Sequence, residues 1–222
     1  MIVFTAHPDD EAFTAGGTIY LNNHNVGETI LICATRGEYG RASLGQEKSA
    51  EEIKQLRFEE LEKAANELGI KEIHISDFPD RGLVKCKKEL MEAWQPIVES
   101  VKPEVMLGFG KDGYTGHLDH IVVGSVASRL ARGVEIPYYA FSLPGGKYHH
   151  SFENCLQKKR IYGSYVNKCS HRDPDIMVEV NSEIKYQILQ IYKSQWPSLD
   201  PYNIFSREDA EHFLRYEYFV KY

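Results

Sequence analysis

Two short segments carry most of the side chains that could do chemistry in this chain. Residues 6–11, AHPDDE, place one imidazole and three carboxylates within five residues, directly after the apolar run at 2–4. Residues 116–120, GHLDH, add two imidazoles and another carboxylate after the apolar run at 105–109. So much negative charge in one place needs a cation or water-rich solvation, and a divalent metal is the simplest answer.

The spacing within these segments suits a metal site with three protein ligands. His7 and Asp10 are three residues apart, as are His117 and His120, and this spacing brings side chains to one side of a helical turn. Zinc is commonly held by three nitrogen or oxygen ligands, with a fourth position left to water. His7, Asp10 and one of the two later imidazoles fit that number. Coordination lowers the pKa of such a water from about 15.7 to about 7.

The remaining groups of the two segments have natural roles in hydrolysis. Asp9 adjoins a ligand and can accept the proton of the water as general base. The imidazole of GHLDH that does not bind the metal can stabilise an oxyanion or protonate a leaving amine. Asp119 can orient that imidazole. The pattern therefore predicts hydrolysis of an amide or an ester by metal-bound water.

Simpler interpretations exist for the same residues. Asp9 and Asp10 at a strand–helix junction would also cap the helix and oppose its dipole. Two His and one carboxylate also match the site of non-haem iron oxygenases. We expect that site on an all-β scaffold, whereas this chain alternates strands and helices. Both segments follow an apolar strand, which favours one shared site over two unrelated helix caps.

Apolar patterns alternate between strand and helix over the first two thirds of the chain. This alternation predicts an α/β, Rossmann-like fold of three layers, α/β/α, with a mostly parallel sheet. If the strands at 2–6 and 104–109 are neighbours, their carboxyl ends face each other across a switch-point crevice, where such folds bind ligands. The other predicted elements are strands at 29–35 and 72–76 and helices at 12–24, 49–68, 89–101 and 119–132.

The final third has a more mixed pattern. We predict strands at 136–141 and 176–180, a helix at 183–195 and an aromatic-rich end at 213–222. Pro96 suggests a kink or break in the helix before residue 101. We find no internal repeat, linker or domain boundary, so we expect one domain over residues 1–222.

Bulk properties exclude several classes of protein. The net charge of −6 and the scattered basic residues argue against a nucleic-acid partner. Four cysteines without CxxC spacing indicate reduced structural thiols in a cytoplasmic protein. No stretch approaches the roughly 20 apolar residues of a membrane segment, and no basic segment with a long apolar run precedes the first strand. These properties leave the oligomeric state open, and a homo-oligomer is one expectation.

AHPDDE near the start together with GHLDH about midway resembles the LmbE-like, or PIG-L, family of metal-dependent de-N-acetylases. The family includes deacetylases of mycothiol and bacillithiol biosynthesis and of glycosylphosphatidylinositol assembly. The resemblance implies that the zinc ligands are His7, Asp10 and His120, with Fe²⁺ as an alternative metal. It also implies that Asp9 is the general base. His117 would polarise or protonate at the reacting amide, with support from Asp119.

The resemblance extends to weaker matches that imply substrate-binding residues. These are Glu38 in TRGEYG, Arg57 in LRFEELEKAANELGI and Asp80 in DFPDRGL. Some members carry a Tyr two residues before the first His of GHxDH. Thr115 holds that place here and Tyr114 comes one residue earlier, so entry of Tyr114 into the site is open. YKSQ at 192–195 resembles the end of a late helix in the family.

The resemblance implies a zinc-dependent hydrolase that removes an N-acetyl group from an N-acetylglucosamine-type amino sugar or conjugate by attack of zinc-bound water. Two alternatives stay open: a catalytically weak, metal-containing sugar-binding protein and a metal-dependent esterase. The expected partner is a small N-acetylated sugar conjugate. The loops at 37–48, 78–86 and 142–175 would form the pocket wall, and they carry no readable code for the natural substrate.

Overall fold

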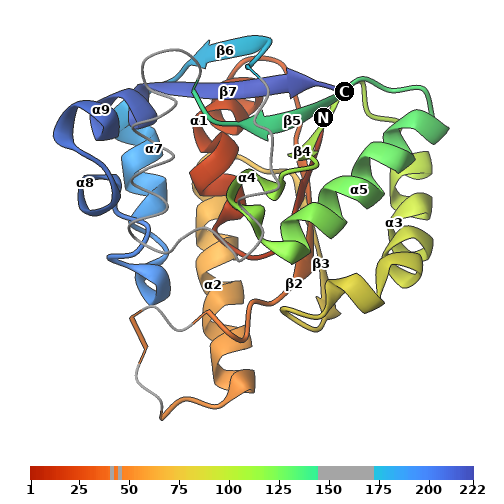
Figure 1. Cartoon of the computed structure of the whole chain (residues 1–222), viewed down its shortest axis with the longest axis horizontal. Helices are drawn as coiled ribbons and strands as arrows, with labels where there is room; N and C mark the ends of the chain where they lie inside the picture. Colours follow the sequence, from red (N-terminus) through yellow and green to blue (C-terminus); the bar gives the residue numbers. More distant parts are fainter. Residues whose placement is uncertain (41–42, 45–46, 145–172) are drawn as a thin grey trace.

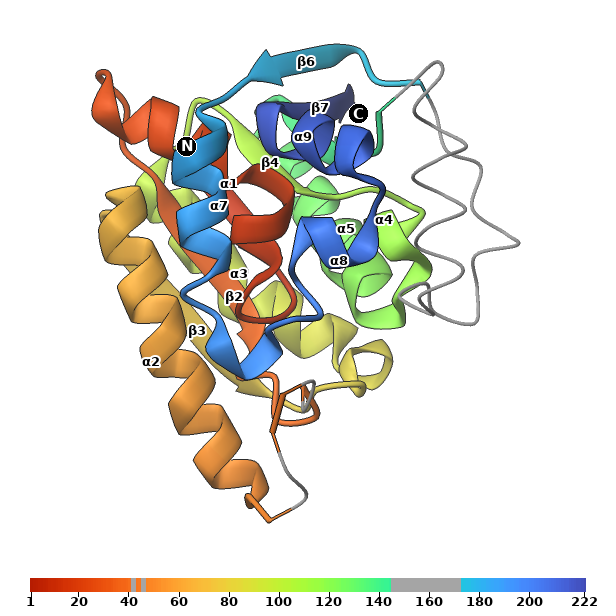
Figure 2. The same cartoon turned by 90° about the vertical axis from the view of Figure 1, so that its left-hand side faces the viewer.

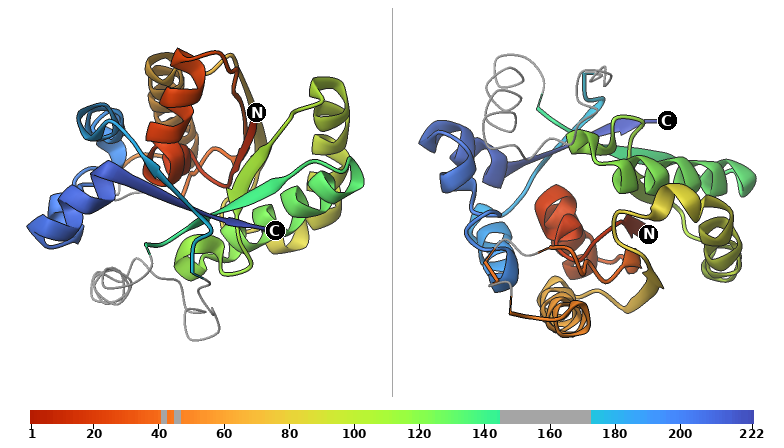
Figure 3. Two further views of the ribbon diagram at one scale, coloured as in Figure 1. Left: turned by 90° about the horizontal axis from the view of Figure 1, so that it is seen from above. Right: turned by 60° about the horizontal axis from the view of Figure 1, so that its bottom comes forward.

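The computed structural model describes residues 1–40, 43–44, 47–144 and 173–222. Within them the chain forms one sheet of seven strands, which runs through the middle of the molecule (Figure 1). From one edge to the other the strands are β3 (Glu72–Phe78), β2 (Ile30–Thr35), β1 (Ile2–Thr5), β4 (Met106–Phe109), β5 (Tyr138–Ser142), β7 (Tyr216–Lys221) and β6 (Ile176–Glu179). The first five are parallel, and β7 is antiparallel to both of its neighbours (Figure 3).

Helices cover both faces of this sheet. Figures 1 and 2 show α1, α2 and α7 together on one face and α3 and α5 on the other. These helices are α1 (Asp10–His24), α2 (Ala50–Leu68), α3 (Lys87–Val101), α5 (Leu118–Gly133) and α7 (Ser182–Leu189). The other helical segments are α4 (Gly113–Gly116), α8 (Pro201–Ile204), α9 (Arg207–Arg215) and the 3₁₀ turns η1 (Leu83–Lys85) and η3 (Lys193–Gln195). The predicted three-layer α/β/α fold is confirmed.

No helix in the part of the chain that the structure describes is long and apolar enough to cross a membrane. That residues 1–222 form one domain stays a prediction.

The helix α2 begins and ends where its sequence predicts. The Ser49 hydroxyl accepts the Glu52 N–H at 3.3 Å, and the Glu52 carboxylate accepts the Ser49 N–H at 2.8 Å, which together form a capping box. Gly69 ends the helix with φ of 69°, a conformation that glycine adopts without strain. Between these ends, α2 places Arg57 on the face that is buried against the sheet.

The strands β1 and β4 are hydrogen-bonded neighbours at the centre of the sheet. Ile2 pairs with Met106 and Val3 with Leu107, and these four side chains are almost fully buried. From β1 the chain turns to α1 on one face, and from β4 it passes to α5 on the other. The predicted switch point is therefore confirmed, and both motifs follow strands that end at it.

One local prediction is wrong. The helix predicted at 183–195 ends at Leu189, because the side chains from Tyr192 onward turn inward to hydrogen-bond with α1 and α2. The end at 213–222 begins as helix α9 before it becomes β7. The helix α3 continues through Pro96 without a break, and Pro96 is exposed.

Close packing of α5 on β4 gives a testable prediction about stability. A Cβ atom at Gly124 would lie 2.2 Å from the Phe109 carbonyl oxygen, whereas one at Gly133 would meet nothing within 4 Å. We expect Gly124→Ala to lower the free energy of unfolding by about 1–3 kcal/mol. Gly133→Ala, in the same helix, should leave it unchanged or raise it by up to about 1 kcal/mol. Urea unfolding measures both, and equal losses would contradict the packing.

Candidate active site

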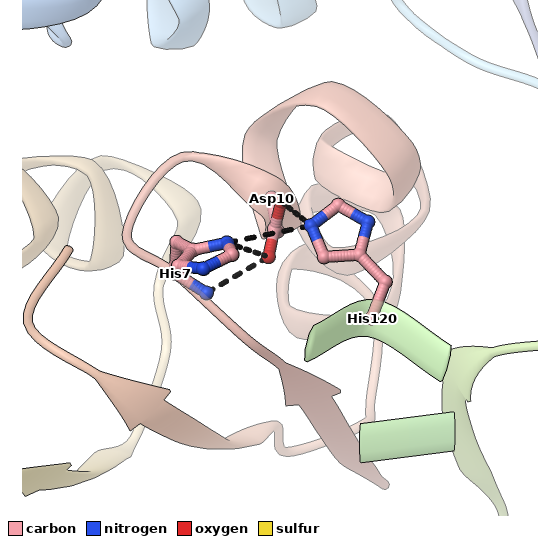
Figure 4. Close-up of side chains that lie close together, drawn as sticks. All are labelled: His7, Asp10 and His120. Atoms are coloured by element: carbon pink, nitrogen blue, oxygen red, sulfur yellow. Dashed lines mark hydrogen bonds and ion pairs between the residues drawn. The ribbon is translucent and has the colours of Figure 1, made fainter. Parts of the chain in front are cut away.

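His7, Asp10 and His120 converge at the switch point (Figure 4). His7 Nδ1 lies 3.6 Å from Asp10 Oδ2, His120 Nε2 lies 3.3 Å from Asp10 Oδ1, and the two ring nitrogens are 3.3 Å apart. Ligand atoms held tetrahedrally at about 2.0–2.1 Å from zinc are about 3.3 Å apart. The donor types and their separations therefore fit one zinc-sized ion.

Acceptor oxygens near the far nitrogen of each ring indicate the proton positions on both imidazoles. His120 Nδ1 lies 3.0 Å from the Gly113 carbonyl oxygen, an acceptor, so Nδ1 carries the proton and Nε2 the lone pair. His7 Nε2 lies 3.1 Å from Asp80 Oδ1 and 3.5 Å from Asp119 Oδ2, which leaves the lone pair on Nδ1. In the neutral form of both rings, two lone pairs and a carboxylate thus face one point, and this arrangement favours a positive charge, a proton or a metal cation, between them.

The backbone around Asp10 holds this ligand in place. Asp10 Oδ2 accepts the N–H groups of Ala6 and His7 at 3.0 and 2.9 Å, which ties the first turn of α1 to the end of β1. Burial disfavours charge on Asp10, but the imidazoles of His120 and His7 hold its pKa well below the usual value. Asp10 is therefore ionised and oriented before a metal binds.

The protonation of His7 is set by the same carboxylates. Burial would lower the pKa of His7, but hydrogen bonds to Asp10 and Asp119 outweigh it and raise that pKa well above its usual value. Without metal, a proton therefore occupies the place between the imidazole and the carboxylate. A divalent cation at this place would displace that proton.

Asp9 lies beside the three ligands with its backbone and side chain both constrained. Its φ of 107° is rare for any residue but glycine. Arg57 Nη2 donates to Asp9 Oδ2 at 2.9 Å and also to the Pro8 carbonyl. Burial raises the pKa of Asp9 to about 6, and the Arg57 guanidinium acts in the opposite direction. This is a suitable range for a general base at neutral pH.

Arg57 lines the cavity, and its contacts give it a role that the sequence did not predict. Its side chain is only 4% exposed, and the guanidinium donates to Asp9, Pro8 and, at 3.2 Å, the Gly37 carbonyl. These contacts make it a clamp on the proposed base. From charge alone, a solvated arginine would be the ordinary interpretation.

His117 begins α5, and its ring Nδ1 accepts the Asp119 N–H at 3.2 Å as a helix cap. Burial, with the neighbouring imidazoles of His120 and His7, lowers the pKa of His117 to about 4. The site therefore favours a neutral His117 with its proton on Nε2. Protonation of the amide by His117 would require the charged imidazolium instead. It can still donate a hydrogen bond into the cavity.

The carboxylate of Asp119 contacts groups other than the predicted partner His117, which accepts only the backbone N–H of Asp119. Its carboxylate is fully buried and accepts the Arg81 and Leu83 N–H groups at 2.5 and 3.1 Å, with Oδ2 3.5 Å from His7 Nε2. The sequence predicted that Asp119 supports His117. These contacts instead favour a carboxylate that orients the candidate metal ligand His7 through its Nε2.

A substitution at Asp119 separates these two roles. If Asp119 orients His7, Asp119→Asn should lower zinc affinity by about 10–100-fold, the range for residues that orient a ligand. If it acts through His117, zinc affinity should stay unchanged while kcat falls. Competition for zinc with a chelating dye measures the affinity, and unchanged affinity would contradict the contact with His7.

The site opens into a cavity of about 300 Å³. Most predicted site residues line it: His7, Asp9, Asp10, Arg57, Asp80, Tyr114, His117 and His120. Tyr114 therefore reaches the cavity, held in an unusual φ of 63°. Glu38 and Asp119 do not line it. Glu38 accepts the Asp80 N–H at 3.0 Å, so it supports the Asp80 loop.

Some described residues of the C-terminal third line the cavity, and others hydrogen-bond to the segments around it. The sequence did not predict these contacts. Ser198, Leu199 and Ile204 line the cavity. Gln195 Nε2 donates to the Gly40 carbonyl at 3.0 Å, and the Ser194 N–H and hydroxyl both donate to a buried glutamate of α2. Only the match of YKSQ pointed to this segment. Of the predicted wall loops, residues 145–172, with Cys155 and Cys169, lie outside the described residues.

Two curated relatives and two solved structures illustrate the similarity. A probable N-acetyl-alpha-D-glucosaminyl L-malate deacetylase 2 of Bacillus anthracis is 36% identical over 135 residues, 59% of this chain and 58% of that protein. A diacetylchitobiose deacetylase of Thermococcus kodakarensis is 28% identical over 197 residues, which cover 86% of this chain and 68% of that protein. The chain spans 50–59% of the length of the first three curated relatives it matches.

The solved structures share the fold at low identity. An N,N'-diacetylchitobiose deacetylase of Pyrococcus horikoshii matches with a TM-score of 0.70 and 22% identity, covering 100% of this chain and 82% of that one. A 4-carboxy-2-hydroxymuconate hydratase of Pseudomonas putida matches with a TM-score of 0.65 and 22% identity, covering 96% and 81%. The fold alone therefore does not decide the reaction.

The family model described as PIG-L, GlcNAc-PI de-N-acetylase, matches residues 2–131. That range is more than half of the chain and holds both motifs, β1, β4 and the converging side chains. The chain belongs to the PIG-L family.

Proposed function

We propose that this protein hydrolyses the N-acetyl group of an N-acetylglucosamine-type amino sugar or conjugate. In this proposal His7, Asp10 and His120 hold one divalent metal ion, and zinc is the first choice. The observation that carries the proposal is the convergence of two imidazole lone pairs and a carboxylate at the floor of a cavity, with buried Asp9 beside them. A bound divalent cation would act as a Lewis acid on the carbonyl oxygen and increase the acidity of a coordinated water.

The chain's own residues can move the protons that amide hydrolysis requires. Asp9, with its pKa near 6, is mostly ionised at pH 7 and accepts a proton as water adds to the acetyl carbonyl. Neutral His117 donates its Nε2–H to the oxyanion that forms. When the C–N bond breaks, the proton held by Asp9 is available for the leaving amine. Acetate and the free amino sugar are the products.

The rim of the cavity offers contacts for the group attached to the sugar. Tyr39 is 52% exposed, and the Arg81 guanidinium carbon lies 5.3 Å from the centre of its ring. No carboxylate among the described residues lies within 4 Å of the Arg81 guanidinium, whereas Arg57 is committed to Asp9. The relatives act, by their names, on an N-acetylglucosaminyl malate, on an inositol glycoside of the acetylated sugar and on diacetylchitobiose. Arg81 favours a conjugate that carries an acid.

A substitution at Arg81 tests this preference. We expect Arg81→Gln to lower kcat/KM for an acid-bearing N-acetylglucosamine conjugate by about tenfold, as for a lost hydrogen bond to a charged group. The methyl ester of the same conjugate should be affected less than twofold. Arg129→Gln, on α5 and outside the cavity, is the control. Equal losses on acid and ester would remove Arg81 from substrate recognition.

A product assay tests the proposed activity. Protein with one equivalent of zinc is incubated with N-acetylglucosamine, diacetylchitobiose and α-linked acid and inositol conjugates of N-acetylglucosamine. The proposal predicts acetate and primary amine in equal amounts, and no release after chelation. Release from acetyl esters alone would indicate the esterase, and sugar binding without release would indicate the binding protein.

A further inference from the structure

Glu11 is a buried carboxylate that the proposed mechanism does not use. It is the second residue of α1, is 0% exposed and does not line the cavity. Its Oε1 accepts the Tyr192 hydroxyl, and its Oε2 accepts the Asp9 N–H at 3.2 Å. Burial raises the pKa of Glu11 to about 8. An ionisable side chain is costly to bury, so its contacts need an explanation.

Asp9 is the residue that these contacts hold. The proposed base occupies a strained left-handed backbone conformation, with φ of 107°. Arg57 Nη2 donates a hydrogen bond to the Asp9 carboxylate at 2.9 Å, and the Glu11 carboxylate accepts one from the Asp9 backbone N–H. Together they constrain the two soft backbone angles and the side-chain direction of one residue.

Tyr192 connects this base to a distant part of the chain. Its side chain is fully buried, and it lies 181 residues from Glu11, beyond the range that the family model matches. The helix α7 ends at Leu189, and the turn that follows is what directs Tyr192 toward α1. The α1–α7 packing therefore supports an atom-to-atom path from Tyr192 through Glu11 to Asp9.

We propose that Glu11 and Tyr192 form a positioning pair that fixes the backbone of Asp9 and so aims its carboxylate at the attacking water. The inference rests on the proposed function for its effect on turnover. Neither residue lines the cavity or belongs to the His7, Asp10 and His120 cluster. A displacement of about 1 Å in a reacting group can cost about 100-fold in rate, so a small shift of Asp9 is sufficient.

Four variants test the pair. Tyr192→Phe removes one hydroxyl and should lower kcat by about tenfold, with KM and zinc affinity within about twofold of wild type. Glu11→Ala should lower kcat by about 10–100-fold. Glu11→Gln keeps an oxygen for the Asp9 N–H and an amide for Tyr192, so it should retain kcat within about threefold. Tyr138→Phe is the control, since it deletes an equally buried hydroxyl that donates to the Phe109 carbonyl at 2.9 Å.

The comparison of variants decides between positioning and general stability. Equal kcat losses in Tyr192→Phe and Tyr138→Phe, or in Glu11→Gln and Glu11→Ala, would overturn the pair. A parallel loss of zinc affinity would also overturn it, because the effect would then act through the ligand Asp10.

A readout without turnover keeps the inference separate from the proposed function. Hydrogen exchange of the Asp9 amide, followed by NMR, should be slow in the wild type and at least about tenfold faster in Glu11→Ala. Tyr138→Phe should leave it unchanged. Absence of acetate release from the wild type would reject the proposed function only. An equally fast Asp9 amide in wild type and Glu11→Ala would reject the pair.

Discussion

Asp9→Asn is expected to lower kcat for acetate release by about 10²–10⁴-fold, the usual contribution of a general base. Asparagine has nearly the same size and can still accept a hydrogen bond from Arg57, but it cannot take a proton from water. Asp9 is not among the three converging ligands, so zinc affinity should stay within about twofold of wild type. Steady-state kinetics and zinc competition on the same preparation measure both quantities.

Asp77→Asn provides the matched control for this substitution. Asp77 lies on β3, is mostly exposed and pairs with Lys54 at 2.7 Å, away from the cavity. Its loss should leave kcat within about twofold, as expected for a surface salt bridge. The base assignment would be wrong if Asp9→Asn kept kcat within about threefold. Loss of zinc in this variant would instead make Asp9 a ligand.

Replacing His120 should have the largest effect on metal binding. His120→Ala removes the Nε2 donor that the Gly113 carbonyl orients toward His7 and Asp10. We expect zinc affinity to fall by more than the roughly 10–100-fold that is typical when a residue that hydrogen-bonds to a metal ligand is replaced. Acetate release at one equivalent of zinc should fall below detection, because the cation is no longer held there.

His117→Ala, in the same motif, is the natural comparison. Its ring caps α5 and lines the cavity, but its Nδ1 faces the Asp119 N–H. This variant should therefore retain zinc within about threefold while kcat falls by about 10²–10³-fold, as for a lost oxyanion donor. If His117→Ala lost zinc and His120→Ala kept it, the two assignments would have to be exchanged.

Hydrophobic patterning was enough to predict the sheet around β1 and β4. Both strands are short, almost entirely apolar and followed by polar turns, so their burial and parallel order follow from composition and connection rules. The C-terminal third was harder, since the residues after Leu189 keep a helical pattern but turn inward. Tyr192 hydrogen-bonds Glu11 on α1, and this long-range contact overrides the local helix preference.

The candidate site was predicted by residue type, but its supporting contacts were not. Spacing within AHPDDE and GHLDH pointed to a cation site, although it did not distinguish His117 from His120. The tautomer that distinguishes them depends on the Gly113 carbonyl, which only the folded turn after β4 brings to His120. In the same way, nothing local to Arg57 indicates that it holds Asp9, 48 residues away.

Titration of metal-free protein with zinc, while acetate and amine are measured from an acid-bearing N-acetylglucosamine conjugate, tests the central claim most directly. A cation held by His7, Asp10 and His120 predicts no release without metal, a linear rise in rate and a break at one equivalent. Acetate and amine should appear in equal amounts. Release that is independent of zinc, or a protein that binds one zinc tightly and releases neither product, would contradict the account.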